Sequence, residues 1–156
     1  MQITDQFEIV QVAEIAPNAR NARKHSDEQI KELLRSLREF GFVNPLLIDK
    51  DKKVIAGRGR LMAAIAEGMT SVPCVYVEHL TEAQRRAYML ADNRLAEHAT
   101  WDSTLLSEEL KFLDDLGFDV TVTGFDLPEP EQEAVEDGYE PELPKVARTG
   151  VPSRPS

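Results

Sequence analysis

The feature that most constrains the fold is a short apolar segment that runs into a glycine-bracketed basic turn. Residues 54–56 (Val-Ile-Ala) favour a strand, and Gly57, Arg58, Gly59 and Arg60 separate them from a helix-forming segment at residues 61–67. A strand that ends at such a turn and enters a helix aims backbone N–H groups and two guanidinium groups at one point. This pattern predicts a phosphate-binding site. The alternative is a plain strand-to-helix connection with solvated arginines, in which the glycines relieve backbone strain.

A second constraint is a group of oxygen-bearing side chains in a downstream helix. The capping box at residues 81–84 predicts a helix that runs to residue 97, and Asp92, Asn93 and Glu97 lie within about one face of it. Such side chains suit a hard cation such as Mg²⁺. The alternative is a solvated helix face. Asn beside Asp inside a helix is locally unfavourable, which is the kind of conflict expected at a functional site.

The remaining patterns indicate an α+β domain. Apolar residues predict strands at 9–15, 46–49, 54–56 and 72–77, a short strand at 120–122, and helices at 27–40 and about 103–116. The strands at 46–49 and 54–56 are expected to form a hairpin. Cys74 is expected to be a buried apolar residue, and Leu61, Ala64 and Ile65 are expected to face the core.

Charge and proline are distributed unevenly along the 156 residues. Residues 1–98 contain 14 basic and 14 acidic residues, whereas residues 99–156 contain 4 and 14, so the net charge of −10 belongs to the C-terminal third. Six of the nine prolines lie at or beyond residue 128. We therefore expect one domain at residues 5–126, with a C-terminal helical extension, and a linker or disordered acidic tail at residues 127–156.

The bulk composition also bears on location and on DNA binding. The sequence shows neither a membrane span nor a secretory signal, so a cytoplasmic protein is expected. An acidic C-terminal third repels a phosphate backbone and argues against extensive nonspecific DNA wrapping. A local basic patch at residues 20–24 and 58–60 remains compatible with this charge balance.

Several motifs occur in an order and spacing that resemble the ParB/sulfiredoxin superfamily. They lie at residues 15–27, 41–46 and 55–60, and the resemblance covers roughly residues 9–97. It implies a small mixed sheet with helices, and binding of CTP or ATP together with Mg²⁺. By the same resemblance, Asp92, Asn93 and Glu97 hold the metal. The nucleotide-binding residues that it implies are Arg23, Gly41, Phe42, Val43, Asn44, Pro45, Gly57, Arg58, Gly59 and Arg60.

A narrower resemblance extends to about residue 126. Residues 57–60, 80–87, 91–96, 101–102 and 123–126 look like the ParB-like N-terminal domains that are attached to phage and prophage DNA methyltransferases. The chain has no Asp/Asn-Pro-Pro-Tyr/Phe segment and no glycine-rich S-adenosylmethionine loop, so it is not expected to be a methyltransferase itself. Sulfiredoxins need a cysteine where this chain has Arg58, so sulfiredoxin activity is not expected either.

These resemblances lead to two functional hypotheses. The first is a nucleotide-binding and Mg²⁺-binding module that regulates or targets DNA modification, with weak nucleoside triphosphatase activity as an open question. The second is a DNA-binding or nuclease module of the ParB-like nuclease family, in which Arg85 and Arg86 extend the basic patch. The expected partners are DNA, a DNA methyltransferase domain or subunit, and a second copy of the chain.

Overall fold

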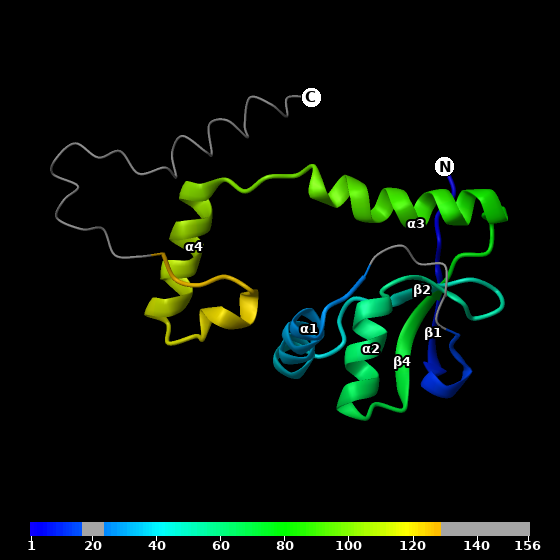
Figure 1. Ribbon diagram of the computed structural model, residues 1–156, viewed down its shortest axis with the longest axis horizontal. Coiled ribbons are helices and arrows are strands. Elements are labelled where there is room, and N and C mark those ends of the chain that lie inside the picture. Colours follow the sequence, from blue (N-terminus) through cyan, green and yellow to red (C-terminus); the bar gives the residue numbers. More distant parts are fainter. Residues whose placement is uncertain (17–23, 129–156) are drawn as a thin grey trace, which may run out of the picture. The chain divides into compact units, whose positions relative to one another are not determined.

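The computed structural model describes residues 1–16 and 24–128, and the chain divides into two units at residues 96 and 97 (Figure 1). The first unit is an α+β fold, as the sequence predicted. Its elements in chain order are strand β1 (Gln6–Gln11), the 3-10 helix η1 (Val12–Glu14), helix α1 (Asp27–Phe40), strands β2 (Leu46–Ile48) and β3 (Val54–Ala56), helix α2 (Arg58–Glu67), strand β4 (Ser71–Tyr76) and helix α3 (Glu82–Glu97).

The four strands form one mixed sheet in the order β1-β4-β2-β3. Strand β1 pairs antiparallel with β4, β4 pairs parallel with β2, and β2 pairs antiparallel with β3 in the predicted hairpin. Helix α2 lies in the connection between β3 and β4. This topology places the turn before α2 at the end of the edge strand β3.

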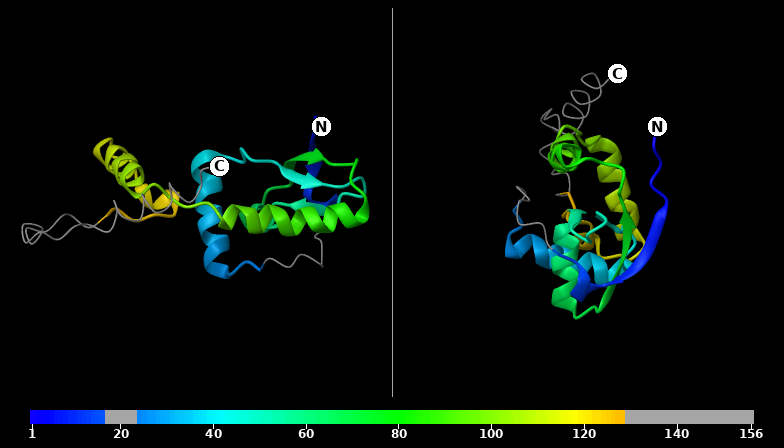
Figure 2. Two further views of the ribbon diagram at one scale, coloured as in Figure 1. Left: turned by 90° about the horizontal axis from the view of Figure 1, so that it is seen from above. Right: turned by 90° about the vertical axis from the view of Figure 1, so that its right-hand side faces the viewer.

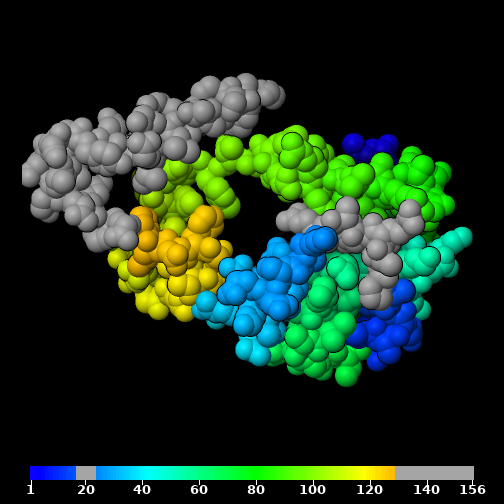
Figure 3. Space-filling view, viewed as in Figure 1, coloured from blue at the N-terminus to red at the C-terminus, as the bar shows by residue number. Residues whose placement is uncertain are grey.

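The two faces of the sheet pack against different helices because successive strand side chains point to opposite faces. Leu46 and Ile48 of β2 belong to a core that includes Leu61 and Ala64 of α2, with Leu37 of α1 packed against it. Helices α1 and α2 lie directly against one another in the space-filling view (Figure 3). Cys74 is fully buried in this core, as predicted.

Helix α3 lies on the opposite side of the sheet from α2 (Figure 2), and it packs there against a second, smaller core. Its one buried residue is Met89, which packs with Ile55 and Val77 and with the partly buried Leu47 and Leu80. Burial of a single side chain contributes on the order of 2 kcal/mol. Apolar burial therefore contributes little to holding α3 on the sheet, and polar contacts contribute more.

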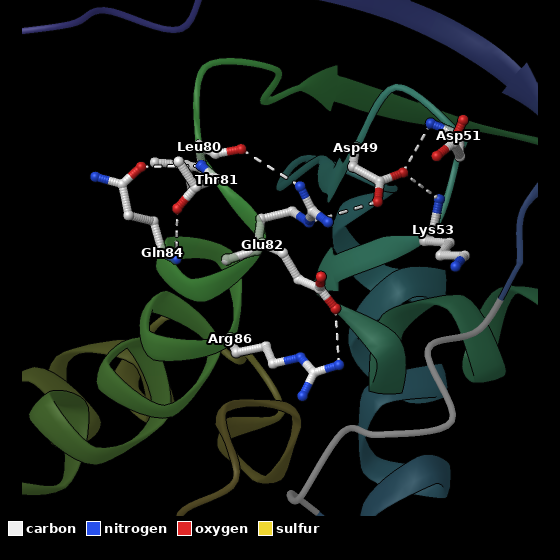
Figure 4. A network of polar contacts seen from close by, with 9 residues as sticks. Asp49, Asp51, Lys53, Leu80, Thr81, Glu82, Gln84 and Arg86 are labelled. Carbon is white, nitrogen blue, oxygen red and sulfur yellow. Dashed lines mark hydrogen bonds and ion pairs between the residues drawn. The ribbon is translucent and has the colours of Figure 1, made fainter.

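Local signals in the sequence account for the helix starts. Ser26 Oγ accepts a hydrogen bond from Gln29 N at 3.0 Å and caps α1. At the start of α3, Thr81 Oγ1 accepts from Gln84 N at 3.1 Å, while Thr81 N donates to Gln84 Oε1 at 2.9 Å (Figure 4). The predicted capping box at residues 81–84 is thus confirmed, and the caps at both helices satisfy N–H groups that a helix leaves unpaired.

The second unit contains helix α4 (Ser103–Asp115) and the 3-10 helix η2 (Val120–Thr123). Asp102 caps α4 by accepting from Leu105 N at 3.1 Å, and Trp101 packs edge-on against Phe125 with ring centroids 5.0 Å apart. The strand predicted at residues 120–122 is wrong. The described residues offer it no partner strand, and Asp119 caps the segment by accepting from Thr121 N at 3.0 Å, so local hydrogen bonds favour a 3-10 turn.

Three further expectations for the first unit need correction. The strand predicted at residues 9–15 instead spans Gln6–Gln11, because β4 starts at Ser71 opposite Gln11 and the following residues turn into the 3-10 helix η1. Helix α2 begins at Arg58 rather than at residue 61. Ile65 is 52% exposed and does not face the core, whereas Ala63, next to Ala64, is buried in its place.

None of the helices in the described part of the chain is long and apolar enough to cross a membrane. The tail prediction concerns residues 127–156, and residues 129–156 of it lie outside the described residues. The single domain at residues 5–126 stays a prediction.

Candidate phosphate-binding site

Gly57 makes the sharp connection between β3 and α2. It has φ 100° and ψ 20°, the left-handed conformation that glycine adopts without a steric penalty. A Cβ atom at this position would lie 2.6 Å from Leu46 Cδ2 and 2.8 Å from Arg60 Nη2. Glycine is therefore required here both by the backbone conformation and by the closeness of the core and of Arg60.

The first turn of α2 contains Arg58, Gly59 and Arg60. Their backbone N–H groups precede the first intrahelical bond of α2, which Leu61 N donates to Gly57 O at 2.9 Å. The N-terminal N–H groups of a helix carry a partial positive charge and bind anions. Because the helix begins at Arg58, the predicted basic turn is itself this helix terminus.

Arg60 joins two of the predicted loops. Its Nη2 donates a hydrogen bond to the carbonyl oxygen of Pro45 at 3.0 Å, which ties the turn at residues 57–60 to the loop at residues 41–45. Its Nε is buried, as is Nε of Arg58, and neither atom has a hydrogen-bond partner among the described residues. Two guanidinium groups with donors left over beside a helix N-terminus form a cationic site that an anion would complete.

Asp92 of α3 acts electrostatically on the same arginine. Burial lowers the pKa of the Arg60 guanidinium, and the Asp92 carboxylate raises it in partial compensation. Asp92 Oδ1 also accepts a hydrogen bond from the Tyr88 hydroxyl at 3.3 Å. Burial raises the pKa of Tyr88, and the charge of Asp92 adds to the effect. The charge of Asp92 therefore acts on the guanidinium of Arg60, which belongs to the other predicted half of the site.

The other two predicted metal ligands are Asn93 and Glu97, which lie further along α3. Asn93 Nδ2 donates to the Met89 carbonyl oxygen at 2.8 Å, which satisfies the amide within the helix and explains how Asn is accommodated there. Glu97 is the last residue of α3. Within residues 1–16 and 24–128, no three His, Cys, Asp or Glu side chains gather to hold a metal on their own.

Helix α3, which carries Asp92, is held to the sheet by a polar network around Asp49 (Figure 4). The Asp49 side chain is 8% exposed, and its Oδ1 accepts from Asp51 N at 2.8 Å and from Lys53 N at 2.9 Å. Its Oδ2 lies 3.7 Å from Arg85 Nε, and Arg85 Nη1 donates to the Leu80 carbonyl at 3.3 Å. One carboxylate thus organises the turn of the β2–β3 hairpin and anchors the first turn of α3.

We expect Asp49→Ala to destabilise the fold by about 1.5–3 kcal/mol, since it leaves two backbone N–H groups and a guanidinium without their charged acceptor. Asp49→Asn keeps an oxygen for the two N–H groups and loses only the charge, so its cost should stay near or below about 1 kcal/mol. Urea unfolding monitored by circular dichroism measures both. Equal losses in the two variants would contradict the assigned hydrogen bonds.

The structure thus brings together most of the residues that the sequence singled out. Gly57, Arg58, Gly59 and Arg60 form the helix terminus, and the loop at residues 41–45 reaches it through Pro45. In that loop Phe42 packs against the core, whereas Val43 is 76% exposed. Arg23 lies outside the described residues.

Sequence reasoning missed two features of this region. One is His25, whose ring packs against Gly59, and the other is the Asp49–Arg85 pair. The histidines showed no metal-ligand spacing, and no local pattern signals a contact between residues more than thirty positions apart.

Comparison with known proteins places this arrangement in a family. The profile of the ParB N-terminal domain matches residues 2–93, more than half of the chain. The chain belongs to the ParB N-terminal domain family. This confirms the predicted membership of the ParB/sulfiredoxin superfamily.

The matched region makes up a different share of each relative's length. It is 47% identical over 73 residues to the ParB-like nuclease domain-containing protein YnaK of Escherichia coli (strain K12), covering 47% of this chain and 84% of YnaK. It is 36% identical over 90 residues to Stage 0 sporulation protein J of Bacillus subtilis (strain 168), covering 55% of this chain but only 32% of that protein. The chain thus spans about a third of the sporulation protein.

A solved structure gives the same fold. The chromosome-partitioning protein ParB of Caulobacter crescentus, C-terminally truncated and complexed with CTP-gamma-S, superposes with a TM-score of 0.61 at 21% identity. The superposition covers 70% of this chain and 63% of that one. At this identity the likeness establishes the fold alone.

Proposed function

We propose that the first unit is a nucleoside triphosphate-binding module that takes CTP or ATP with Mg²⁺ at the N-terminus of α2. The observation that carries the proposal is the state of the two arginines in the first turn of that helix, whose buried Nε atoms lack partners among the described residues. A triphosphate would supply acceptors to these donors and to the N–H groups of residues 58–60. The CTP-gamma-S bound by the Caulobacter relative supports this choice of ligand class.

Mg²⁺ fits this site as an ion shared between protein and phosphates. Mg²⁺ is usually held by one or two carboxylates together with substrate phosphates and water, rather than by an all-protein cage. Asp92 supplies a carboxylate that acts electrostatically on Arg60, and Asn93, the following residue of α3, supplies a side-chain amide oxygen. Glu97 would be a further ligand. Bound Mg²⁺ would neutralise phosphate charge, while Arg60 and the helix terminus orient the phosphates.

The biological role that we propose is regulation or targeting of DNA modification. The motifs at residues 80–87 and 91–96 and the acidic, proline-containing C-terminal third resemble modules attached to phage-type DNA methyltransferases. The partner would therefore be a methyltransferase domain or subunit, and self-association into a homodimer is compatible with such a module. Location in the cytoplasm belongs to the same proposal.

Isothermal titration calorimetry tests nucleotide binding directly. We expect CTP, ATP or GTP to bind the full chain with one site per protomer at about millimolar Mg²⁺, and more weakly in a chelator because unshielded carboxylates repel the phosphates. A folded protein that binds none of the three nucleotides would exclude the assignment.

The second candidate function is DNA binding or nuclease activity, which the basic residues near α2 favour. Two of the arginines that would extend a DNA-binding patch are engaged elsewhere, however. Arg85 pairs with Asp49, and Arg86 Nη2 donates to Glu82 Oε2 at 2.8 Å. Among the described residues of the predicted patch this leaves Lys24, Arg58 and Arg60 as the cations, which is a small footprint for duplex DNA.

We expect the isolated chain to bind duplex DNA weakly, with a shallow salt dependence. Each phosphate neutralised contributes a slope of about −0.9 in a plot of log K against log salt, so contact with two or three phosphates predicts a slope of about −2 to −3. Fluorescence anisotropy with a labelled duplex at several salt concentrations measures it. Tight, sequence-specific binding at physiological salt would make DNA recognition the primary function.

A further inference from the structure

His25 lies where the N-termini of two helices meet. It directly precedes the N-cap of α1, Ser26, and its half-buried ring packs against Gly59 in the first turn of α2. A Cβ at Gly59 would come within 2.9 Å of His25 Cε1 and 2.8 Å of Leu33 Cδ1, so any larger residue would displace the ring. Glycine at position 59 therefore lets an imidazole reach the helix terminus that we assign to phosphates.

The hydrogen bond of the ring defines which nitrogen is available. His25 Nδ1 lies 3.0 Å from Gln29 Oε1, one turn further along α1. With the amide oxygen as acceptor, Nδ1 carries a hydrogen, so in the neutral ring Nε2 carries only a lone pair. Two ring atoms approach Gly59: Cε1 at 2.9 Å and Nδ1 at 3.1 Å from the position that its Cβ would take. Because Nδ1 is already bonded to Gln29, Nε2, which is bonded to Cε1, is the ring nitrogen left for a ligand.

We propose that His25 is a phosphate-contact residue of this site and that nucleotide binding is coupled to uptake of a proton by its ring. The inference rests on the proposed nucleotide function. A phosphate at the first turn of α2 would face the lone pair of a neutral ring. A proton taken from solvent onto Nε2 replaces that repulsion by a charge-assisted hydrogen bond, while Nδ1 keeps its bond to Gln29.

Charged residues of both signs belong to the elements around the ring. The cations are Arg58 and Arg60 on α2 and Lys24, which precedes His25, and the anions are Asp27 and Glu28 in the first turn of α1. The triphosphate brings several negative charges to the same point, so the balance shifts toward the imidazolium when nucleotide binds.

Calorimetry in two buffers of different ionisation enthalpy counts the protons taken up with the nucleotide. A pH of about 7.5 suits the measurement because it lies above the ordinary histidine pKa of about 6.5. The nucleotide phosphates also exchange protons, so variants isolate the contribution of the ring. His25→Asn removes the titrating group and should lower the proton uptake, whereas His79→Asn, a matched change at an exposed histidine, should leave it unchanged. CTP with Mg²⁺ is the first probe, and ATP is the second.

The affinity should follow the same pattern. We expect His25→Asn to weaken binding about tenfold near pH 6.5 and less than about threefold near pH 8.5, since only the charged ring supplies the strong contact. A variant-free measurement is the ¹⁵N spectrum of the His25 imidazole in the wild-type chain, which should show both nitrogens protonated when nucleotide is bound.

The possible outcomes separate this inference from the proposed function. If nucleotide binds, but proton uptake is the same in the His25→Asn and His79→Asn variants and the His25 ring stays neutral, the role of His25 is wrong while the site stands. If no nucleotide binds to the folded wild type, the proposed function fails and the inference fails with it.

Discussion

Gly57→Ala is expected to cost about 2–5 kcal/mol of stability, because two penalties act at one position. The left-handed backbone conformation, at φ 100°, costs an alanine about 1–2 kcal/mol. The new methyl group would also lie 2.6 Å from Leu46 Cδ2, and Leu46 is fully buried and unable to move freely. Overpacking of this kind typically adds about 1–3 kcal/mol.

Gly68 supplies a matched control for the backbone term. It ends α2 with φ 85° and ψ 19°, close to the conformation of Gly57, and a Cβ at Gly68 would meet no atom within 4 Å. Gly68→Ala should therefore cost only the conformational penalty of about 1–2 kcal/mol. Urea unfolding of both variants measures the difference. Equal costs would show that Leu46 and Arg60 yield easily and that the close packing at Gly57 is unimportant.

The same pair of variants also tests the link between stability and binding. The methyl group of Gly57→Ala would lie 2.8 Å from Arg60 Nη2, so the guanidinium must leave its bond to Pro45. We expect the loss of this bond to lower the nucleotide affinity of Gly57→Ala. Gly68→Ala, at the far end of α2, should keep the wild-type affinity. Calorimetry on the folded fraction decides between these outcomes.

The parts of the fold that were predictable from the sequence depend on short-range signals. The boundaries of α1 follow from the Ser26 cap and from Gly41 at its end, whose positive φ of 82° glycine adopts without a steric penalty. Strand β4 follows from its β-branched residues, although it carries a proline, Pro73, at a pairing position opposite Ile9. Caps, stop residues and propensity act within a few positions, so one sequence contains them.

The parts that could not be predicted depend on contacts between distant residues. The register of β1 is decided by where β4 begins, sixty residues later in the chain. At residues 120–122, alternating Val and Thr favour a strand, yet no partner strand is present in the described part of that unit, and the Asp119 cap prevails. His25 reaches the site only because α1 packs on α2, and the buried Asp49 is explained only by Arg85.

The candidate site shows the same division. The sequence identified the residues at the α2 terminus by their glycine and arginine content, but not that Arg60 bonds the Pro45 carbonyl or that Asp92 acts on the same guanidinium. The bond to Pro45 forms because the fold brings the loop at residues 41–45 to the turn at residues 57–60. The effect of Asp92 arises because Met89 packs α3 against the opposite face of the sheet. Long-range packing therefore turned two separate motifs into one candidate site.

Arg60→Ala is expected to weaken nucleotide binding about ten- to hundred-fold, a loss of about 1.5–3 kcal/mol, because it removes a charge-assisted phosphate contact. The guanidinium acts on the phosphates themselves, so the loss should persist when a chelator removes Mg²⁺. Arg86→Ala deletes the same charge from an exposed residue that pairs with Glu82, and it should leave binding nearly unchanged. A similar loss in both variants would mean that net charge, rather than the site, governs affinity.

Asp92→Ala should give the opposite metal dependence. In the presence of Mg²⁺ the variant loses a ligand of the ion, and binding weakens. In a chelator the wild-type carboxylate repels the triphosphate, so its removal should cost nothing or improve affinity slightly. Glu82→Ala, on the same helix, controls for the loss of a negative charge. Calorimetry of the variants with and without Mg²⁺ therefore separates the phosphate-binding role of Arg60 from the metal-binding role of Asp92. If Asp92→Ala weakens binding equally with and without Mg²⁺, the assignment of Mg²⁺ to this site is wrong.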